Sequence, residues 1–243
     1  MTIYLTSSPC IDGAERAILN PQNDFLDRIR EDLPENPSCL FVASSPDDHA
    51  ATCEFGAAMF CAFADAGIHF SSYQILDRWT EEFAADLIMD SDFIILAGGH
   101  APTQNEFFRE IGLDMLLCDY EGVILGISAG SMNSASIVYI QPEEEGESSP
   151  EFQRFAPGLG LTDIQICPHY QKVKDNILDG LRLFEDITYE DSMDNCFFAL
   201  PDGSYLCIHG EETLLCGEAW VIRDGEMEKI AEDGDVLNLT ETE

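Results

Sequence analysis

The sequence predicts an α/β protein with a flavodoxin-like, doubly wound and mostly parallel sheet, helices on both faces and a C-terminal antiparallel β meander. Strand-like and helix-like segments alternate over residues 1–135. Several strand-like segments are continuously apolar, as at residues 93–96, which is typical of parallel strands buried on both faces. A chain of 243 residues can bury one substantial core, so we expect one domain over residues 1–243 that includes the meander over residues 196–238.

The elements of the parallel sheet follow from the succession of patterns along residues 1–135. Short apolar runs predict strands, and the longer segments between them predict helices. The helix that begins at residue 47 has Asp47 or Asp48 as its expected N-terminal cap. The predicted strands are residues 2–6, 38–44, 69–76, 92–97 and 122–127, and the predicted helices are residues 22–32, 47–66, 80–89 and about 103–120.

The pattern changes after residue 135. Residues 141–155 carry a run of glutamates and are predicted to form a loop. Residues 161–168 predict a short strand, and residues 171–184 predict a helix. The short strands of the meander are separated by two turn sequences, Pro-Asp-Gly at residues 201–203 and Arg-Asp-Gly at residues 223–225.

The charge of the chain excludes several classes of partner. It has 47 acidic and 11 basic residues, a formal net charge of −36, so its long-range field repels nucleic acid and anionic membrane. No apolar stretch approaches the roughly 20 residues that span a bilayer. The first residues lack the pattern of a signal peptide, which predicts a cytoplasmic protein. We expect a monomer or a homodimer.

The residues Gly126-Ile127-Ser128-Ala129-Gly130 are the most informative part of the sequence. They follow an apolar, strand-like run and precede small residues that are compatible with a helix. A Gly-x-Ser-x-Gly sequence between a strand and a helix predicts a nucleophile elbow, in which a sharp turn exposes the serine above the sheet. An ordinary strand-to-helix turn can contain the same letters, so the prediction needs support from the rest of the chain.

A second glycine-rich turn, Gly98-Gly99-His100, closes the preceding apolar strand. One crossover separates this strand from the strand before the elbow, so we expect the two to be neighbours, with function at their carboxyl ends. The main-chain N–H groups of Gly99 and Ala129 would then face the developing oxyanion of an acyl-transfer reaction. His100, in the same turn, is a candidate for substrate contact.

His169 is the best candidate for the general base among the five histidines. It directly follows the strand-like segment after the nucleophile's unit, and Pro168 restricts the backbone before it. His209 lies in the meander and ranks below it. The acid that orients the base stays open between Glu143, Glu144 and Glu145 of the loop and Asp163 and Asp175 near His169.

The chain resembles the peptidase S51 family, which comprises dipeptidase E (aspartyl dipeptidase) and cyanophycinase-like serine hydrolases. The resemblance is carried by the Ala-Gly-Gly of residues 97–99, the elbow at residues 126–130 and the Pro-His-Tyr of residues 168–170. It implies that Ser128 is the nucleophile and His169 the general base, with Gly99 and Ala129 as oxyanion donors. It also implies that Glu143 is the acid, although dipeptidase E carries aspartate there.

A preference for peptides with an N-terminal aspartate is a further implication of the resemblance. Such a preference needs cations near the site, for which Arg154 and Lys172 are candidates, or these are only surface charges. The family commonly has asparagine after the two glycines, where this chain has His100. His100 and Gln104 are therefore further candidates for substrate binding.

These observations predict a serine-type peptidase that hydrolyses short peptides through an acyl-enzyme on Ser128. No cysteine or histidine cluster has metal-binding spacing, so neither a metal nor an organic cofactor is predicted. Two alternatives stay open. One is a non-catalytic binding or stress protein on a glutamine-amidotransferase-like scaffold, and the other is an esterase or amidase with a non-peptide substrate.

Overall fold

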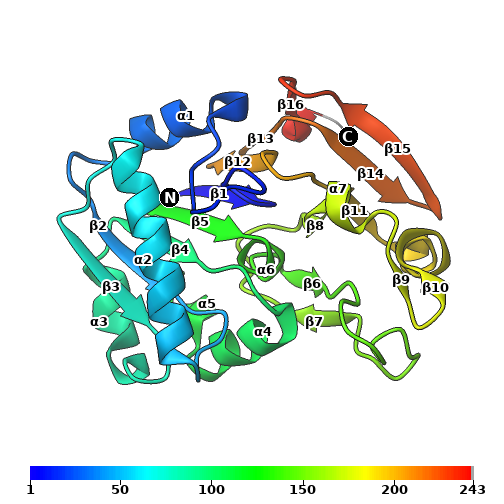
Figure 1. Ribbon diagram of the computed structural model, residues 1–243, viewed down its shortest axis with the longest axis horizontal. Helices are drawn as coiled ribbons and strands as arrows, with labels where there is room; N and C mark the ends of the chain where they lie inside the picture. The colour runs from blue at the N-terminus through cyan, green and yellow to red at the C-terminus, as the bar shows by residue number, and fades with distance from the viewer. Residues whose placement is uncertain (242–243) are drawn as a thin grey trace.

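A large sheet covered by helices is the main feature of the computed structural model, which describes residues 1–241 (Figure 1). Within these residues the sheet has eight strands in the order β16-β13-β12-β1-β5-β4-β2-β3. The strands β1, β5, β4, β2 and β3 are parallel, whereas β12, β13 and β16 pair antiparallel beyond β1. The strand bounds are β1 Thr2–Thr6, β2 Ser38–Val42, β3 Ser72–Leu76, β4 Phe93–Leu96, β5 Val123–Ile127, β12 Tyr205–His209, β13 Glu212–Cys216 and β16 Val236–Asn238.

Helices cover both faces of this sheet, as the sequence predicts. Side chains alternate between the faces of a strand, so Tyr4 packs with the helices of one face and Leu5 with those of the other. The first face is covered by α1 and α2, and the second by α3 to α6. Asp48 caps α2, since its carboxylate accepts a hydrogen bond from the main-chain N–H of Ala51 at 3.0 Å. The helix bounds are α1 Phe25–Asp32, α2 His49–Asp65, α3 Ala84–Met89, α4 Ala101–Glu110, α5 Leu113–Leu116, α6 Ala129–Met132, α7 Tyr170–Val173 and α8 Tyr189–Asp191.

A second, four-stranded sheet has the order β15-β14-β11-β8. The antiparallel strands predicted for the C-terminal region are present, but they divide between the two sheets. Strand β11 pairs parallel with β8, and the register places Ala199 opposite Cys167. The remaining strand bounds are β6 Ile137–Tyr139, β7 Phe155–Pro157, β8 Gln165–Cys167, β9 Ile177–Leu178, β10 Leu181–Arg182, β11 Cys196–Ala199, β14 Ala219–Arg223 and β15 Glu226–Ala231.

Two predicted helices differ from the structure. The helix expected over about residues 103–120 is divided into α4 and α5 at Gly112, which has a φ of +64°. The helix expected over residues 171–184 is wrong beyond α7, because β9 and β10 form a hairpin there. Its turn residues Asp179 and Gly180 have φ values of +52° and +87°, and positive φ at both central residues favours a tight hairpin turn. A π-helical turn, Leu183–Thr188, follows.

The carboxyl ends of the parallel strands meet at one edge of the large sheet. Thr6 of β1 lies opposite Ile127 of β5, and Leu96 of β4 lies opposite Gly126. The turns that follow β1, β4 and β5 therefore lie close together at this edge of the sheet. Among residues 1–241, no helix is both long enough and apolar enough to cross a membrane.

Candidate active site

Ser128 occupies a sharp turn between β5 and α6. Its φ of 48° and ψ of −108° are unusual for a residue with a side chain, and such strain is often found at functional sites. Gly130 has to be glycine here, because a Cβ at this position would collide with the main-chain carbonyl of Leu96. The turn thus has the geometry of a nucleophile elbow.

His169 approaches the Ser128 hydroxyl from the second sheet. It follows β8, and its Nε2 lies 2.9 Å from Ser128 Oγ, which is hydrogen-bond distance. His169 itself has a φ of +58°, and its main-chain N–H donates to Ser7 Oγ at 2.6 Å. The structure therefore brings together the two residues that the sequence predicts as nucleophile and base.

The carboxylate that contacts the other ring nitrogen of His169 belongs to Asp202. Asp202 Oδ1 lies 2.6 Å from His169 Nδ1. The family resemblance assigns Glu143 to this position, but among residues 1–241 the ring nitrogens of His169 contact Asp202 and Ser128, and Glu143 forms no hydrogen bond or ion pair with them. Asp163 and Asp175 do not contact the ring either. The expectation for Glu143 is thus not met by the geometry: the carboxylate at the His169 ring is that of Asp202.

Strand pairing explains the position of Asp202. It follows β11 as His169 follows β8, and these two strands are parallel neighbours. Their carboxyl ends place both residues at the same edge of the second sheet. The sequence pattern predicts an antiparallel meander for this segment, with residues 201–203 only as a turn. Only the parallel pairing of β11 with β8 would have indicated that Asp202 lies beside His169.

Two further side chains hold Asp202. Ser7 Oγ donates to Asp202 Oδ1 at 2.9 Å, and Lys172 Nζ lies 2.8 Å from Asp202 Oδ2. Lys172 also contacts Asp12 at 2.8 Å. Burial raises the pKa of the Asp202 carboxyl, but the hydrogen bond with His169 and the Lys172 ammonium outweigh it and hold the pKa well below its usual range. These contacts therefore favour the charged form of Asp202.

The lowered pKa of Asp202 predicts a pH-dependent contribution to stability. A carboxyl with a lower pKa in the folded protein stabilises it above the unfolded pKa, about 3.9, and this contribution disappears as the pH falls through the folded pKa. We expect the free energy of unfolding of wild type to exceed that of Asp202→Asn most above about pH 5, and the difference to shrink below about pH 4. Urea unfolding across this range measures it, and a difference that grows on acidification would contradict the assignment.

The main-chain N–H groups of Gly99 and Ala129 are the candidate oxyanion donors beside Ser128. Within residues 1–241, the N–H groups of Gly99 and Ala129 have no hydrogen-bond partner. Ala129 is the first residue of α6, and Gly99 lies on the wall of the cavity that contains Ser128. Gly99 has a φ of +157°, and a Cβ there would lie 2.5 Å from Ser44 Oγ, so glycine permits this close packing. The arrangement can hold a developing negative charge.

A cavity of about 550 Å³ opens next to Ser128 and His169. Its wall is mostly apolar, with a few polar groups. Glu143 lies on this wall, although it does not contact His169 as an orienting acid. The lining residues are Ser8, Phe55, Gly98, Gly99, Ile127, Ser128, Met132, Gln141, Pro142, Glu143, Pro168, His169, Val173, Asn176 and Leu183.

The four residues predicted to bind substrate lie away from this wall among the described residues. Gln104 is buried, and its amide donates to the carbonyl of Ala97 at 2.8 Å. Arg154 lies 3.4 Å from Asp191 and donates to main-chain carbonyls of the loop between β6 and β7, residues 140–154, which we call the glutamate loop. Lys172 is paired with Asp202, as described above. The fourth, His100, contacts the same glutamate loop.

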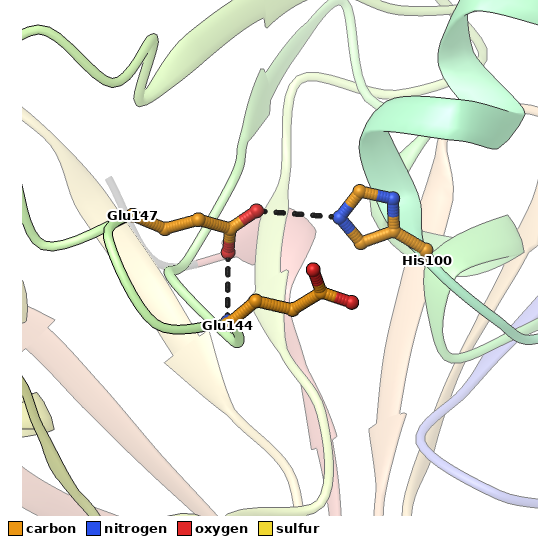
Figure 2. Close-up of side chains that lie close together, drawn as sticks. All are labelled: His100, Glu144 and Glu147. Atoms are coloured by element: carbon orange, nitrogen blue, oxygen red, sulfur yellow. Dashed lines mark hydrogen bonds and ion pairs between the residues drawn. The ribbon is translucent and has the colours of Figure 1, made fainter.

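His100 lies close to the side chains of Glu144 and Glu147 of the glutamate loop (Figure 2). His100 Nε2 lies 3.3 Å from Glu147 Oε1, and Thr103 Oγ1 lies 2.8 Å from His100 Nδ1. The other Glu147 oxygen accepts hydrogen bonds from the main-chain N–H groups of Glu143 and Glu144, at 2.8 and 3.0 Å. Among residues 1–241, the side chains of His100, Glu144 and Glu147 form the one group whose possible metal-ligand atoms all lie within 4.8 Å of one another. Both oxygens of Glu147 have protein partners, which connect His100 to the loop.

Comparisons with known proteins identify the family of this chain and a similar fold. The sequence model of peptidase family S51 matches residues 9–216, a range that contains Ser128, His169 and Asp202. The structure is similar to the 1.5 Å crystal structure of a protein from Listeria monocytogenes EGD-e that is provisionally named peptidase E, with a TM-score of 0.59 and 18% identity over 95% of this chain and 98% of that one. At this identity the likeness shows a shared fold. A search of curated proteins gave no match.

Proposed function

Because the chain belongs to peptidase family S51, we propose that it is a serine-type peptidase that hydrolyses short peptides through an acyl-enzyme on Ser128. The observation that carries this proposal is the 2.9 Å separation between Ser128 Oγ and His169 Nε2. A serine hydroxyl needs such a base to become nucleophilic, and the base needs a group that orients it. Asp202 supplies that third group.

The mechanism proceeds in two steps. In the first, His169 takes the proton of the Ser128 hydroxyl as its oxygen attacks the scissile carbonyl, and Asp202 stabilises the imidazolium that forms. The N–H groups of Gly99 and Ala129 donate to the carbonyl oxygen as it becomes negative. His169 then protonates the leaving amine. In the second step, water attacks the acyl-enzyme, His169 removes its proton, and Ser128 is released with its proton restored.

The size and charge of the cavity limit the substrate. A volume of about 550 Å³ suits a short peptide. An N-terminal aspartate would need a positive partner, but no lysine or arginine lies among the described residues that line the cavity. Arg154 and Lys172 are engaged with other carboxylates. We therefore propose a peptidase for short peptides without the preference for aspartate.

A neutral fluorophosphonate probe and a pair of matched substrates test this function. We expect the probe to label the wild-type protein once, at Ser128, and the protein to cleave the dipeptide Ala-Ala. Absence of labelling would favour a non-catalytic binding protein instead. Cleavage of an alanine ester, with no cleavage of Ala-Ala at any enzyme concentration, would favour an esterase.

A further inference from the structure

Glu143 holds a position in the cavity that the triad does not explain. Among the described residues that line the cavity, Glu143 and His169 are the only ionisable ones. Within residues 1–241, the Glu143 carboxylate forms no hydrogen bond or ion pair, and its main-chain N–H donates to Glu147. Glu143 is exposed, so a carboxylate without a protein partner lines the space in which a substrate of Ser128 would lie.

Apolar side chains and further acidic groups surround Glu143, and the acidic groups favour its pairing with a cation. Phe55, Met132, Val173 and Leu183 give much of the cavity wall an apolar character. Crowding by protein atoms raises the pKa of the Glu143 carboxyl, and the charges of Glu147 and Glu144 act in the same direction, whereas His100 and His169 lower the pKa. A carboxylate beside further acidic groups is stabilised by a cation.

The glutamate loop is fixed in this place by contacts on both sides. Glu147 connects the main chain at Glu143 to His100, next to the Gly98-Gly99 turn. Arg154 donates to the carbonyl of Glu147 at 3.0 Å and to that of Ser148 at 3.2 Å. These contacts hold the loop before any substrate arrives, and a preorganised charge discriminates between substrates better than a mobile one.

We propose that Glu143 selects substrates whose acyl part carries a positively charged amine or guanidinium group, which pairs with its carboxylate while Ser128 attacks the adjacent carbonyl. This inference rests on the proposed function. The charge has two possible sources in a short peptide, the N-terminal α-ammonium group or the side chain of lysine or arginine. The same chemistry serves both sources, and the substrates distinguish them.

The experiment compares kcat/KM for Lys-Ala, Ala-Ala, Asp-Ala and N-acetyl-Ala-Ala in the wild type and two variants. Glu143→Gln removes the charge in the cavity. Glu145→Gln is the matched control, because it removes one charge from an exposed position of the same loop that does not line the cavity. The control therefore reports the general effect of lowering the net negative charge by one.

A side-chain source predicts that wild type prefers Lys-Ala over Ala-Ala, and an α-ammonium source predicts that it prefers Ala-Ala over N-acetyl-Ala-Ala. In either case we expect a ratio of about tenfold or more, the usual effect of one charged hydrogen bond. Glu143→Gln should reduce that ratio to about threefold or less, and Glu145→Gln should preserve it.

Two results would overturn the inference. One is a wild type that cleaves Asp-Ala best, and the other is a Glu143→Gln variant in which both ratios are unchanged. Labelling by the neutral fluorophosphonate shows that Glu143→Gln is folded and that Ser128 is reactive. Loss of labelling in wild type would instead remove the proposed function, so the two failures are distinguishable.

Discussion

Replacing Ser128 with alanine is expected to lower kcat for a dipeptide by about 10⁶-fold, because no other group can form the acyl-enzyme. The base would lose the hydroxyl that lies 2.9 Å from His169 Nε2. The activity that is left, about 10³–10⁴ over water, would come from binding and from the oxyanion donors. Steady-state hydrolysis measures the loss, and the fluorophosphonate probe should no longer label the protein.

Ser136→Ala is the control for this variant. Ser136 lies a few residues beyond the elbow, is partly exposed and does not line the cavity. Its variant should be labelled and should hydrolyse substrate as wild type does. If Ser128→Ala retained wild-type hydrolysis, the proposed mechanism would be wrong.

Replacing Asp202 with asparagine is expected to lower kcat by about 10⁴-fold while leaving the fold intact. The Asp202 carboxylate accepts the N–H of His169 Nδ1, so Nε2 is left unprotonated and faces Ser128. An asparagine amide can donate to Nδ1 instead, which favours the tautomer with its proton on Nε2. That tautomer cannot take the serine proton.

The rate of fluorophosphonate labelling, together with kcat, measures this effect. Asp175→Asn is the matched control, since Asp175 is an exposed aspartate near His169 that does not contact its ring. It should label at the wild-type rate. Normal activity in Asp202→Asn would mean that the contact between Asp202 and His169 does not orient the base.

The parts of the site that the sequence predicts are those with local signals. The elbow around Ser128 is specified by five consecutive residues between a strand and a helix. Its two glycines are typical of a sharp strand-to-helix turn, so the local sequence is enough to predict it. The strand order around Gly99 follows from one short crossover, and β4 and β5 are indeed neighbours. His169 is found because it ends a strand close in sequence to the nucleophile's unit.

The parts that the sequence does not predict depend on contacts between distant segments. Asp202 reaches His169 only because β11 pairs with β8, and no local pattern specifies that pairing. The hairpin of β9 and β10 replaces a predicted helix because a two-residue turn decides the local structure. Arg154 and Lys172 lie near His169 in sequence, but in a chain with 47 acidic and 11 basic residues each finds carboxylates away from the cavity.

The Ser7 hydroxyl joins the two sheets at the reaction centre. It follows β1 of the large sheet, accepts the main-chain N–H of His169 and donates to Asp202, and both of those residues follow strands of the small sheet. Ser128 thus follows a strand of the large sheet, whereas His169 and Asp202 follow strands of the small sheet. Transfer of the proton from Ser128 to His169 therefore depends on the relative position of the two sheets. A shift of about 1 Å between them would lower the rate by about 10²-fold, although the hydrogen bonds within each sheet stayed intact.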